Sequence, residues 1–574
     1  MTKDELKRFV QVAQGKVPAE LVLKNGQVFH SFTGEFLTAD IAIESGRIAG
    51  IGSYAGREEI DVSGRYVTPG FIDGHVHIES SMLSPLEFTR AVVPQGTTAV
   101  VTDPHEIANV AGLEGVFYML RSDRQLPLDM YFMLPSCVPS TPLEDSGATL
   151  TAQDLAPLLE DPRVLGLAEM MNVPGVLLGD DGVYDKLTMA KRLHVEGHAP
   201  GLMGQALMGY AAAGVSSDHE CLTREEGEAR LRAGMYLEIR EGSAAHNLQA
   251  LLPLVNDRTA PFCLFVTDDR HPADLLREGH INYIVRQAVA AGMPAARAIN
   301  MATVNAARYF GLRDLGVIAP RYRADLAVFD DLENWQPSMV FKDGRLAAED
   351  GRMRLELPAV DASALKASVH LAPVRLSQLA LPMAGVTANV IGLVPHQIVT
   401  KHLRMPVRTE AGCAVSDPEN EILKLAVFER HQASGQVGVA LMHGFGLRRG
   451  AIASTVAHDS HNLIVAGAND ADMLLAVHEI ERIQGGLAIV CDGQVLGSLP
   501  LPIGGLMSEQ PAAEVASAVA RLVDIARGLG VYECYDPFLT LAFLSLPVIP
   551  ELKLTDRGLV DVNAFRFITI ESEG

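Results

Sequence analysis

Six side chains that can bind a metal ion stand where apolar runs of this sequence end. They are His75, His77, Glu169, His198, His219 and Asp268. Neutral imidazoles and carboxylates are good ligands for manganese, iron and zinc. Six such groups can hold two divalent ions that share one carboxylate, and such ions lower the pKa of water enough to supply hydroxide near neutral pH. The sequence therefore predicts a hydrolytic centre with two metals.

The pair His75 and His77 closes the first of these runs, GFIDGHVH. In a strand, residues two apart point to the same side, so both imidazoles are expected to face the same metal. Taken alone, an H-x-H pair is weak evidence, because either histidine could be a hydrogen-bonded core residue. An ordered series of donors at the ends of successive runs is much harder to obtain by chance.

The other donors also have plainer interpretations. Glu169 could cap a helix or form an ion pair, but a carboxylate at the end of a buried run is costly unless a cation neutralises it. His198 and His219 could be hydrogen-bonded histidines beside the centre. Either Asp268 or Asp269 could face the metal, and Asp268 is preferred because the buried run leads directly into it.

Three further polar stretches are candidates for the same pocket. Asp103, His105 and Glu106 follow the second apolar run, where a strand-end turn is an equally good interpretation. Residues 240–243 (REGS) follow the seventh run and could contact a substrate or form surface salt bridges. The cluster at residues 458–462 (HDSHN) could lie near the pocket or form a surface turn.

The elements that must position these residues are buried strands that alternate with helices. The eight apolar runs are GFIDGHVH, TTAVVTDPHE, DMYFMLPS, VLGLAEMMN, LHVEGHAP, GVSSDHE, MYLEIREGS and FCLFVTDD. Stretches such as ADLLREGHINYIVRQAVAAG indicate amphipathic helices between strands. Eight such units predict an α/β fold, a (β/α)₈ TIM-like barrel over residues 69–312, whose active site forms at the carboxyl ends of the strands. A doubly wound open sheet is the alternative, but it does not require eight consecutive units.

Short β runs broken by Gly, Pro and Asp occupy residues 1–68 and return at residues 313–354. We expect these two segments to form one small β-sandwich that flanks the barrel. Residues 355–574 mix apolar runs with helical stretches such as ADMLLAVHEIERIQ and AAEVASAVARLVDIARG. This mixture predicts an additional C-terminal α+β domain.

Composition excludes several classes of partner. The chain has 574 residues, 48% of them hydrophobic, and a formal charge of −23 without a long Lys/Arg run, so nucleic acid is not an expected partner. No run approaches the roughly 18 apolar residues of a membrane helix, and the first residues predict a charged amphipathic helix rather than a signal peptide. A cytoplasmic location is expected. The six cysteines are scattered without a C-x-x-C pair and are expected to be reduced.

Several motifs resemble those of the adenine deaminases in the amidohydrolase superfamily. They are PGFIDGHVHIESSMLSP, TDPHEIANV, AEMMN, GHAPGL, SSDHE, EIREGS and TDDRHP in the barrel region, and GFGLRRGAIASTVAHDSHNLIVAG and LPLPIGGLMS in the C-terminal part. The resemblance covers essentially the whole chain. The H-x-H motif alone indicates only the superfamily, whereas HIESSMLSP, HEIANV and the AHDSHN region together indicate this branch.

The resemblance implies hydrolysis of adenine to hypoxanthine and ammonia at a binuclear manganese or iron centre, with zinc also possible. Carried over by motif, His75, His77 and Asp268 bind one metal, His198 and His219 bind the other, and Glu169 bridges them. The expected partner is a purine base, and a homo-oligomer is expected by analogy.

The catalytic groups are less sharply defined by sequence. Asp268 is expected to accept the proton of the attacking water and pass it to the leaving amine. A pocket acid, Glu106, His105 or Glu220, could protonate a ring nitrogen. The expected substrate contacts are Glu220, Ser243 and Asp269.

Two competing functions remain. A cyclic amide hydrolase of the dihydroorotase or hydantoinase kind shares the barrel and the H-x-H motif, but its relatives typically bridge the metals with a carboxylated lysine after the fourth strand, where VLGLAEMMN offers Glu169. A barrel homologue kept as a structural protein typically lacks the ligands. Every expected donor is present here.

Overall fold

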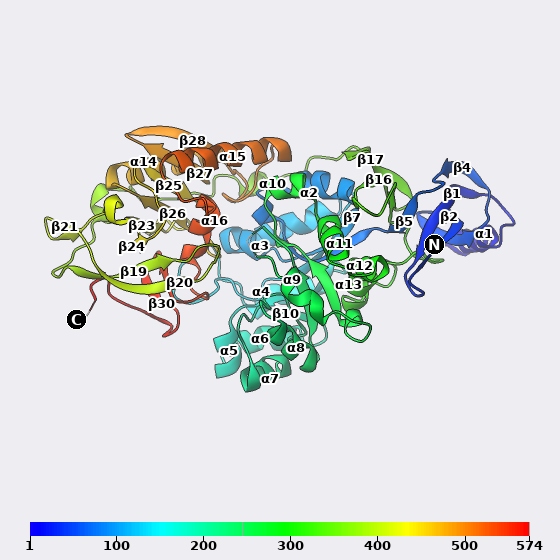
Figure 1. Cartoon of the computed structure of the whole chain (residues 1–574), viewed down its shortest axis with the longest axis horizontal. Coiled ribbons are helices and arrows are strands. Elements are labelled where there is room, and N and C mark those ends of the chain that lie inside the picture. The colour runs from blue at the N-terminus through cyan, green and yellow to red at the C-terminus, as the bar shows by residue number, and fades with distance from the viewer. Residues whose placement is uncertain (244, 573–574) are drawn as a thin grey trace.

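The computed structural model describes residues 1–243 and 245–572. Three parts follow one another along the long axis of the molecule, with the two termini near opposite ends (Figure 1). A sheet built around the N-terminal strands lies at one end, a ring of parallel strands with its helices lies in the centre, and the C-terminal residues form the other end. The active-site candidates lie where the central and C-terminal parts meet.

Each of the eight apolar runs forms a strand of the central part. The strands are β6 (Phe71–His77), β7 (Thr97–Thr102), β8 (Asp129–Leu134), β9 (Val164–Met170), β10 (His194–Gly197), β11 (Ser217–Asp218), β12 (Tyr236–Arg240) and β13 (Cys263–Val266), which continues as β14 (Asp268–Asp269). All paired strands are parallel, in the orders β10-β9-β8-β7-β6-β14 and β11-β12-β13. The N–H of Ser216 donates to Val195 O over 2.9 Å and joins the two sheets. The predicted TIM-like barrel is confirmed.

The barrel strands are buried on both faces because helices cover the outside and side chains fill the inside. All seven residues of β6 are buried. Ile72, Val101, Met133 and Leu264, from four different strands, belong to one apolar cluster with Tyr309 from α13 (Val304–Tyr309). The main covering helices are α2 (Pro85–Val92), α3 (His105–Asp123), α5 (Val173–Leu178), α6 (Asp181–Met189), α7 (Gly204–Ala212), α8 (Arg224–Arg232) and α12 (Ala295–Met301).

The stretch ADLLREGHINYIVRQAVAAG, which was expected to form one helix, forms two, so that prediction was wrong. The segment divides into α10 (Pro272–Arg277) and α11 (Ile281–Ala290). Gly279 between them has φ +111°, a value that favours glycine and ends a helix. The buried His280 ring then contacts Thr97 Oγ1 over 2.8 Å and Asp73 Oδ2 over 3.1 Å. These bonds turn the chain against the barrel strands.

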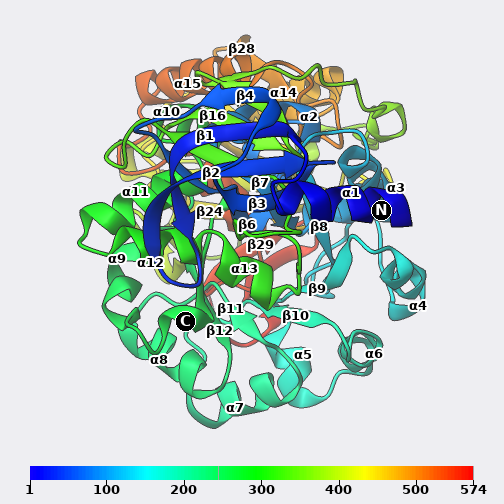
Figure 2. The ribbon, with the colours of Figure 1, turned by 90° about the vertical axis from the view of Figure 1, so that its right-hand side faces the viewer.

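The N-terminal sheet has nine strands and draws on two distant segments of sequence. From the first segment come β1 (Ala19–His30), β2 (Glu35–Glu44), β3 (Arg47–Gly52), β4 (Gly56–Asp61) and β5 (Tyr66–Pro69), and from the second come β15 (Leu326–Phe329), β16 (Pro337–Lys342), β17 (Arg345–Glu349) and β18 (Arg352–Met353). β15 pairs antiparallel with β5 and so joins the segments. The expected N-terminal helix is present as α1 (Lys3–Ala13) with a Thr2–Glu5 capping box. Figure 2 shows this sheet in front of the barrel.

The C-terminal part is built on an eight-stranded sheet. Its order is β20 (Thr400–Pro406), β19 (Thr387–Leu393), β24 (Val437–His443), β23 (Ile422–Phe428), β26 (Leu463–Gly467), β25 (Ala451–Ser454), β27 (Gly486–Cys491) and β28 (Gln494–Pro500). The stretches expected to be helical form α14 (Asp470–Ile483) and α15 (Ala512–Gly528), and α16 (Pro537–Ala542) follows. The six cysteines, all within the described residues, form no disulfide bonds in the structure.

A buried ion cluster ties the base of the barrel to the N-terminal sheet. Asp129, the first residue of β8, lies 2.7 Å from Lys342 Nζ, 2.7 Å from Arg323 Nη2 and 2.9 Å from Arg163 Nη2. Burial would raise the pKa of Asp129, but these three cations hold it at about 2.

We expect the ionised Asp129 to contribute about 2 kcal/mol to stability above pH 4, because its pKa is lower in the folded than in the unfolded chain. This contribution is lost as pH falls from about 4 towards 2. Urea unfolding should therefore show a weaker pH dependence for Asp129→Asn than for the wild type. The control is Asp257→Asn, since Asp257 is 94% exposed in its ion pair; equal slopes for Asp129→Asn and wild type would contradict the account.

Candidate active site

The six predicted metal ligands meet at the carboxyl ends of the barrel strands. His75 Nε2 and His77 Nε2 lie 3.2 Å apart. Asp268 Oδ1, from β14, lies 3.6 Å from the first nitrogen and 3.1 Å from the second. β14 pairs in parallel with β6, so backbone pairing brings these three side chains together.

Glu169 lies between this group and the other two histidines. Its Oε1 is 3.4 Å from His77 Nε2, and its Oε2 is 2.7 Å from His198 Nδ1 and 3.3 Å from His219 Nε2. The carboxylate thus faces one group with each oxygen. This is the placement that a bridging ligand between two metals requires.

Hydrogen bonds behind the first two histidines orient them for metal binding. His77 Nδ1 lies 3.1 Å from the carbonyl oxygen of Asp103, which can only accept, so Nδ1 carries the hydrogen and Nε2 has a lone pair. His75 Nδ1 contacts the buried Glu196 over 3.4 Å. In the neutral His77 ring this lone pair is directed towards Asp268 Oδ1 at 3.1 Å and Glu169 Oε1 at 3.4 Å, an arrangement of donors that suits one cation. The residues therefore fit a metal ion.

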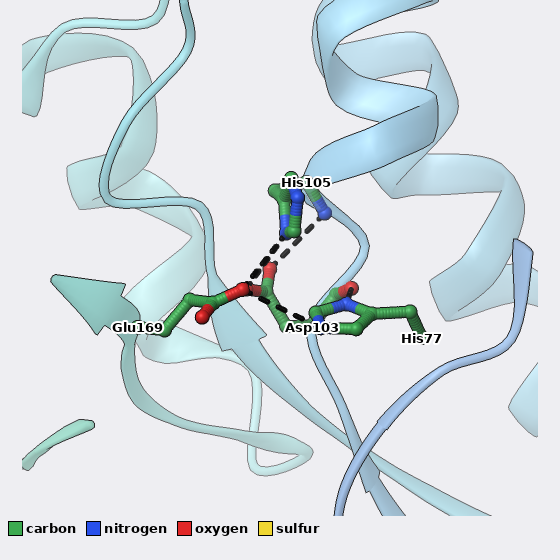
Figure 3. Close-up of side chains that lie close together, drawn as sticks. All are labelled: His77, Asp103, His105 and Glu169. Carbon is green, nitrogen blue, oxygen red and sulfur yellow. Dashed lines mark hydrogen bonds and ion pairs between the residues drawn. The ribbon is translucent and has the colours of Figure 1, made fainter. Parts of the chain in front are cut away.

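The turn after β7 places His105 against this centre (Figure 3). Asp103 accepts from the backbone N–H of His105 over 3.0 Å and contacts His105 Nδ1 over 3.0 Å. His105 Nδ1 also lies 3.7 Å from Glu169 Oε1. Asp103 thus fixes the turn and also orients a histidine of the pocket. The stretch is therefore both a strand-end turn and part of the pocket.

Glu106 and Asp269 share the hydroxyl of Ser80. Ser80 Oγ lies 2.6 Å from Glu106 Oε1 and 2.5 Å from Asp269 Oδ1. A hydroxyl has one hydrogen, so it donates to one carboxyl group and accepts from the other, which must be protonated. Burial, with the nearby Glu79 and Asp269 carboxylates, raises the pKa of Glu106 well above its usual range. Glu106 is therefore the carboxylic acid of this pair.

Arg240, at the end of β12, joins two other candidates. Its Nη1 donates to Glu220 and, over 2.6 Å, to Asp268 Oδ2. All three side chains are buried. Burial would raise the pKa of Asp268, but Arg240 and the two histidines of the first group hold it well below its usual range. The second oxygen of Asp268 remains directed at the histidines.

Ser243 is the predicted substrate contact that does not reach this cavity. Its hydroxyl donates to Asp274 over 2.5 Å and accepts from the backbone N–H of His271 over 2.8 Å. It lines a neighbouring cavity of about 240 Å³ instead. Glu220 and Asp269 do line the catalytic cavity.

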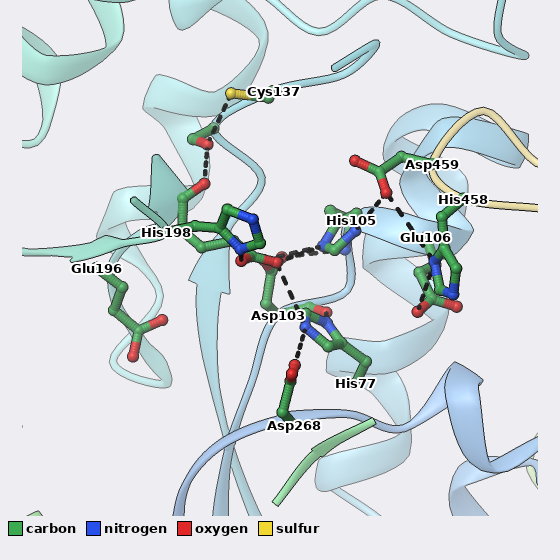
Figure 4. A network of polar contacts seen from close by, with 12 residues as sticks. His77, Asp103, His105, Glu106, Cys137, Glu196, His198, Asp268, His458 and Asp459 are labelled. Atoms are coloured by element: carbon green, nitrogen blue, oxygen red, sulfur yellow. Dashed lines mark hydrogen bonds and ion pairs between the residues drawn. The ribbon is translucent and has the colours of Figure 1, made fainter. Parts of the chain in front are cut away.

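The C-terminal part closes the cavity opposite the barrel (Figure 4). His458 Nδ1 lies 3.8 Å from Glu106 Oε1, and Asp459 Oδ1 lies 3.7 Å from His105 Nε2. Residues 458–462 are all buried, so this segment is not a surface turn, and His458 and Asp459 are its two members that line the cavity. The remaining wall from this part is apolar: Ile398, Phe543, Leu546 and Ile549.

Sequence reasoning missed two buried carboxylates behind the histidines. Glu196 contacts His75, and Glu238 Oε2 lies 3.9 Å from His219 Nδ1. Each precedes a recognised pocket residue by two positions, Glu196 before His198 and Glu238 before Arg240. Both could have been found from the sequence, because residues two apart in a strand point to the same side and each carboxylate therefore faces the same way as a recognised pocket residue.

Among the described residues, no helix combines the length and apolar character needed to cross a membrane.

Comparisons with known proteins agree with this architecture. The family model described as the amidohydrolase family matches residues 66–347, and the model described as the adenine deaminase C-terminal domain matches residues 397–566. "Adenine deaminase 2" of Carboxydothermus hydrogenoformans is 56% identical over 98% of this chain and 99% of its own length. "Adenine deaminase" of Nitratidesulfovibrio vulgaris strain DP4 is 49% identical over 98% of this chain and 99% of its own length. "Adenine deaminase" of Dehalococcoides mccartyi strain ATCC BAA-2266 / KCTC 15142 / 195 is 47% identical over 99% of this chain and 99% of its own length. Identity at this level along the whole chain shows that the protein belongs to the adenine deaminase family of the amidohydrolases.

Proposed function

We propose that this protein hydrolyses adenine to hypoxanthine and ammonia at a centre of two divalent metal ions. The observation that carries the proposal is Glu169, whose two oxygens face two separate groups of histidines. Family membership and the adenine deaminases that match the full chain support the substrate. The inferred setting is cytoplasmic purine salvage by a homo-oligomer. In the proposed domain organisation, residues 1–68 and 313–354 form a β-sandwich that flanks the barrel. Residues 355–574 form a C-terminal α+β domain.

In the proposed centre, His75, His77 and Asp268 hold one ion, His198 and His219 hold the other, and Glu169 bridges them. Manganese or iron is proposed, and zinc is compatible with the same ligands. Such ions lower the pKa of water and polarise the substrate. The role of the buried Glu196 is to keep the His75 ring in place through its contact with Nδ1.

Asp268 is placed to move a proton. Arg240 holds one of its oxygens, so the carboxylate stays ionised and cannot rotate freely. Its other oxygen can accept a proton from the attacking water and pass it to the departing amine. Glu106, as a carboxylic acid, can donate a proton to a ring nitrogen as the tetrahedral carbon forms, and Ser80 keeps it oriented.

Replacing Glu106 with Gln is expected to lower kcat for adenine by about 10²–10⁴-fold, the usual contribution of a general acid, because an amide cannot deliver this proton. Steady-state kinetics with metal analysis will measure the effect. The metal content should remain that of the wild type, since Glu106 is not among the proposed ligands. Unchanged kcat in fully loaded Glu106→Gln would remove Glu106 from the reaction.

The competing cyclic amide hydrolase is disfavoured by the absence of a bridging lysine. No lysine occurs among the described residues that line the cavity. The buried Lys186 of α6 is directed elsewhere, since its Nζ donates to Ser136 O over 2.7 Å.

The test is ammonia release and the change in ultraviolet absorbance when adenine is added to protein loaded with Mn²⁺ or Fe²⁺. Turnover of adenine but not of cytosine or dihydroorotate is the expected result. No ammonia from fully loaded protein would overturn the adenine assignment, and hydrolysis of dihydroorotate or hydantoin would then assign the alternative.

A further inference from the structure

The Asp459 carboxylate is buried in the cavity wall without a full set of hydrogen-bond partners. It is 2% exposed and lines the catalytic cavity. Its Oδ1 lies 3.7 Å from His105 Nε2 and 4.0 Å from His458 Nδ1, and its Oδ2 has no hydrogen-bond partner among the described residues. A buried oxygen of this kind costs free energy unless a ligand supplies a donor.

The position of Asp459 relative to the metal ligands indicates which part of a ligand it meets. The His105 ring lies between them: its Nδ1 is 3.7 Å from Glu169 Oε1, and its Nε2 is 3.7 Å from Asp459 Oδ1. Asp459 is therefore separated from the metal ligand Glu169 by an imidazole ring and a gap of 3.7 Å on either side of that ring. A small flat ligand that reaches both places would therefore meet the metal centre with one edge and Asp459 with the opposite edge.

The surrounding wall fits an aromatic ring. Phe543 stacks on His458 with centroids 4.6 Å apart and an interplanar angle of 25°. Together with Ile398, Leu546 and Ile549 it gives the cavity an apolar face from the C-terminal part. Such a face provides area for a purine but no hydrogen bonds, so Asp459 is one of the few polar groups on this side that can orient it.

Glu106, His458 and His461 also lie close enough together to be considered as a third metal site. The backbone N–H of Ala457 donates to His461 Nδ1 over 3.1 Å. Neutral His461 therefore carries its hydrogen on Nε2, the nitrogen that faces Glu106 Oε2 at 3.7 Å. A nitrogen that carries a hydrogen cannot bind a metal ion, so the hydrogen-bond pattern of His461 does not favour a metal site here.

We propose that Asp459 accepts a hydrogen bond from the five-membered-ring N–H of a free purine base and so selects bases over nucleosides. The inference rests on the proposed function: when the 6-amino group faces the metal ligands, N9 is the five-membered-ring nitrogen on the far side, whereas N7 lies next to the amino group. A nucleoside carries its sugar on this ring, lacks the N–H and would bring a bulky group against Asp459. The bond is present before and during the reaction, so it strengthens substrate binding more than it accelerates chemistry.

The test compares adenine, 9-methyladenine and 7-methyladenine as substrates and as competitive inhibitors of wild type and Asp459→Ala. A hydrogen bond to a charged group contributes about 1.5–3 kcal/mol, so Asp459→Ala should raise KM for adenine by about 10- to 100-fold with little change in kcat. The same variant should bind one of the methylated bases at least as tightly as the wild type does. A methylated nitrogen has no hydrogen to donate to Asp459, and the smaller alanine makes room for the methyl group. The base that is accommodated identifies the nitrogen that Asp459 contacts.

Two controls separate this role from a structural one. Ser460→Ala removes the hydrogen bond from Ser460 Oγ to Glu144, a contact of the barrel with the C-terminal part, but leaves the cavity wall intact, so KM for adenine should stay within about twofold of wild type. Asp459→Asn keeps an acceptor oxygen and should give an intermediate KM, and it serves if Asp459→Ala does not fold. Equal losses for adenine and both methylated bases, or an unchanged KM for adenine, would overturn the proposal. Failure of wild type to deaminate adenine would instead overturn the proposed function.

Discussion

Glu169→Gln is expected to lose bound metal and to lower kcat/KM for adenine by at least about 10³-fold. An amide carries no charge and cannot bridge two cations through two equivalent oxygens. Losing the bridge removes several kcal/mol of stabilisation of the transition state, which corresponds to this factor. The measurement is ammonia release together with metal content by mass spectrometry.

The matched control for this substitution is Glu160→Gln, an exposed glutamate in the same βα unit, just ahead of β9. It should retain both the metal content and the activity of the wild type. A Glu169→Gln protein that keeps two metals and turns over adenine within tenfold of the wild type would contradict the bridging role.

Arg240→Met is expected to give the largest loss of stability, about 3–5 kcal/mol. The substitution leaves Glu220 and Asp268 buried without the cation that contacts both. Urea unfolding of metal-free protein measures the change without compensation from bound metal. The activity should fall as well, since Asp268 loses the bond that orients it.

Two further variants define what Arg240 contributes. Arg240→Lys keeps the positive charge but cannot reach both carboxylates with the same geometry, so its stability should lie between that of Arg240→Met and the wild type. Arg258→Met changes an exposed arginine and should be nearly neutral. A loss for Arg240→Met no greater than that for Arg258→Met would rule out the buried cluster as a source of stability.

The sequence was sufficient to predict the barrel and to bring the ligand candidates to one rim, because both depend on local pattern. Each strand is an apolar run that ends abruptly, and the parallel order of a barrel brings those ends to one rim. All six candidates could therefore be placed together from the strand pattern alone: His75, His77, Glu169, His198, His219 and Asp268. The preference for Asp268 over Asp269 agrees with the geometry, in which Asp268 faces the histidines and Asp269 contacts Ser80.

Contacts between distant segments could not be predicted in this way. Asp459 lies beside His105 although the two are far apart in the chain, and no periodicity in either segment specifies the docking of the C-terminal part on the barrel. Ser243 shows the opposite failure, because its place after a strand suggested the cavity while Asp274 holds its hydroxyl outside it. The break at Gly279 was missed because the apolar pattern continues through it, and His280 packs against the barrel only in three dimensions.

The most direct test of the account is a titration of metal-free protein with Mn²⁺ while ammonia release from adenine is followed. We predict that activity rises from near zero and reaches a plateau at two ions per subunit, because Glu169 and the two histidine groups form one shared centre. A plateau at one ion, or full activity before any metal is added, would contradict the two-metal centre that Glu169 is inferred to bridge.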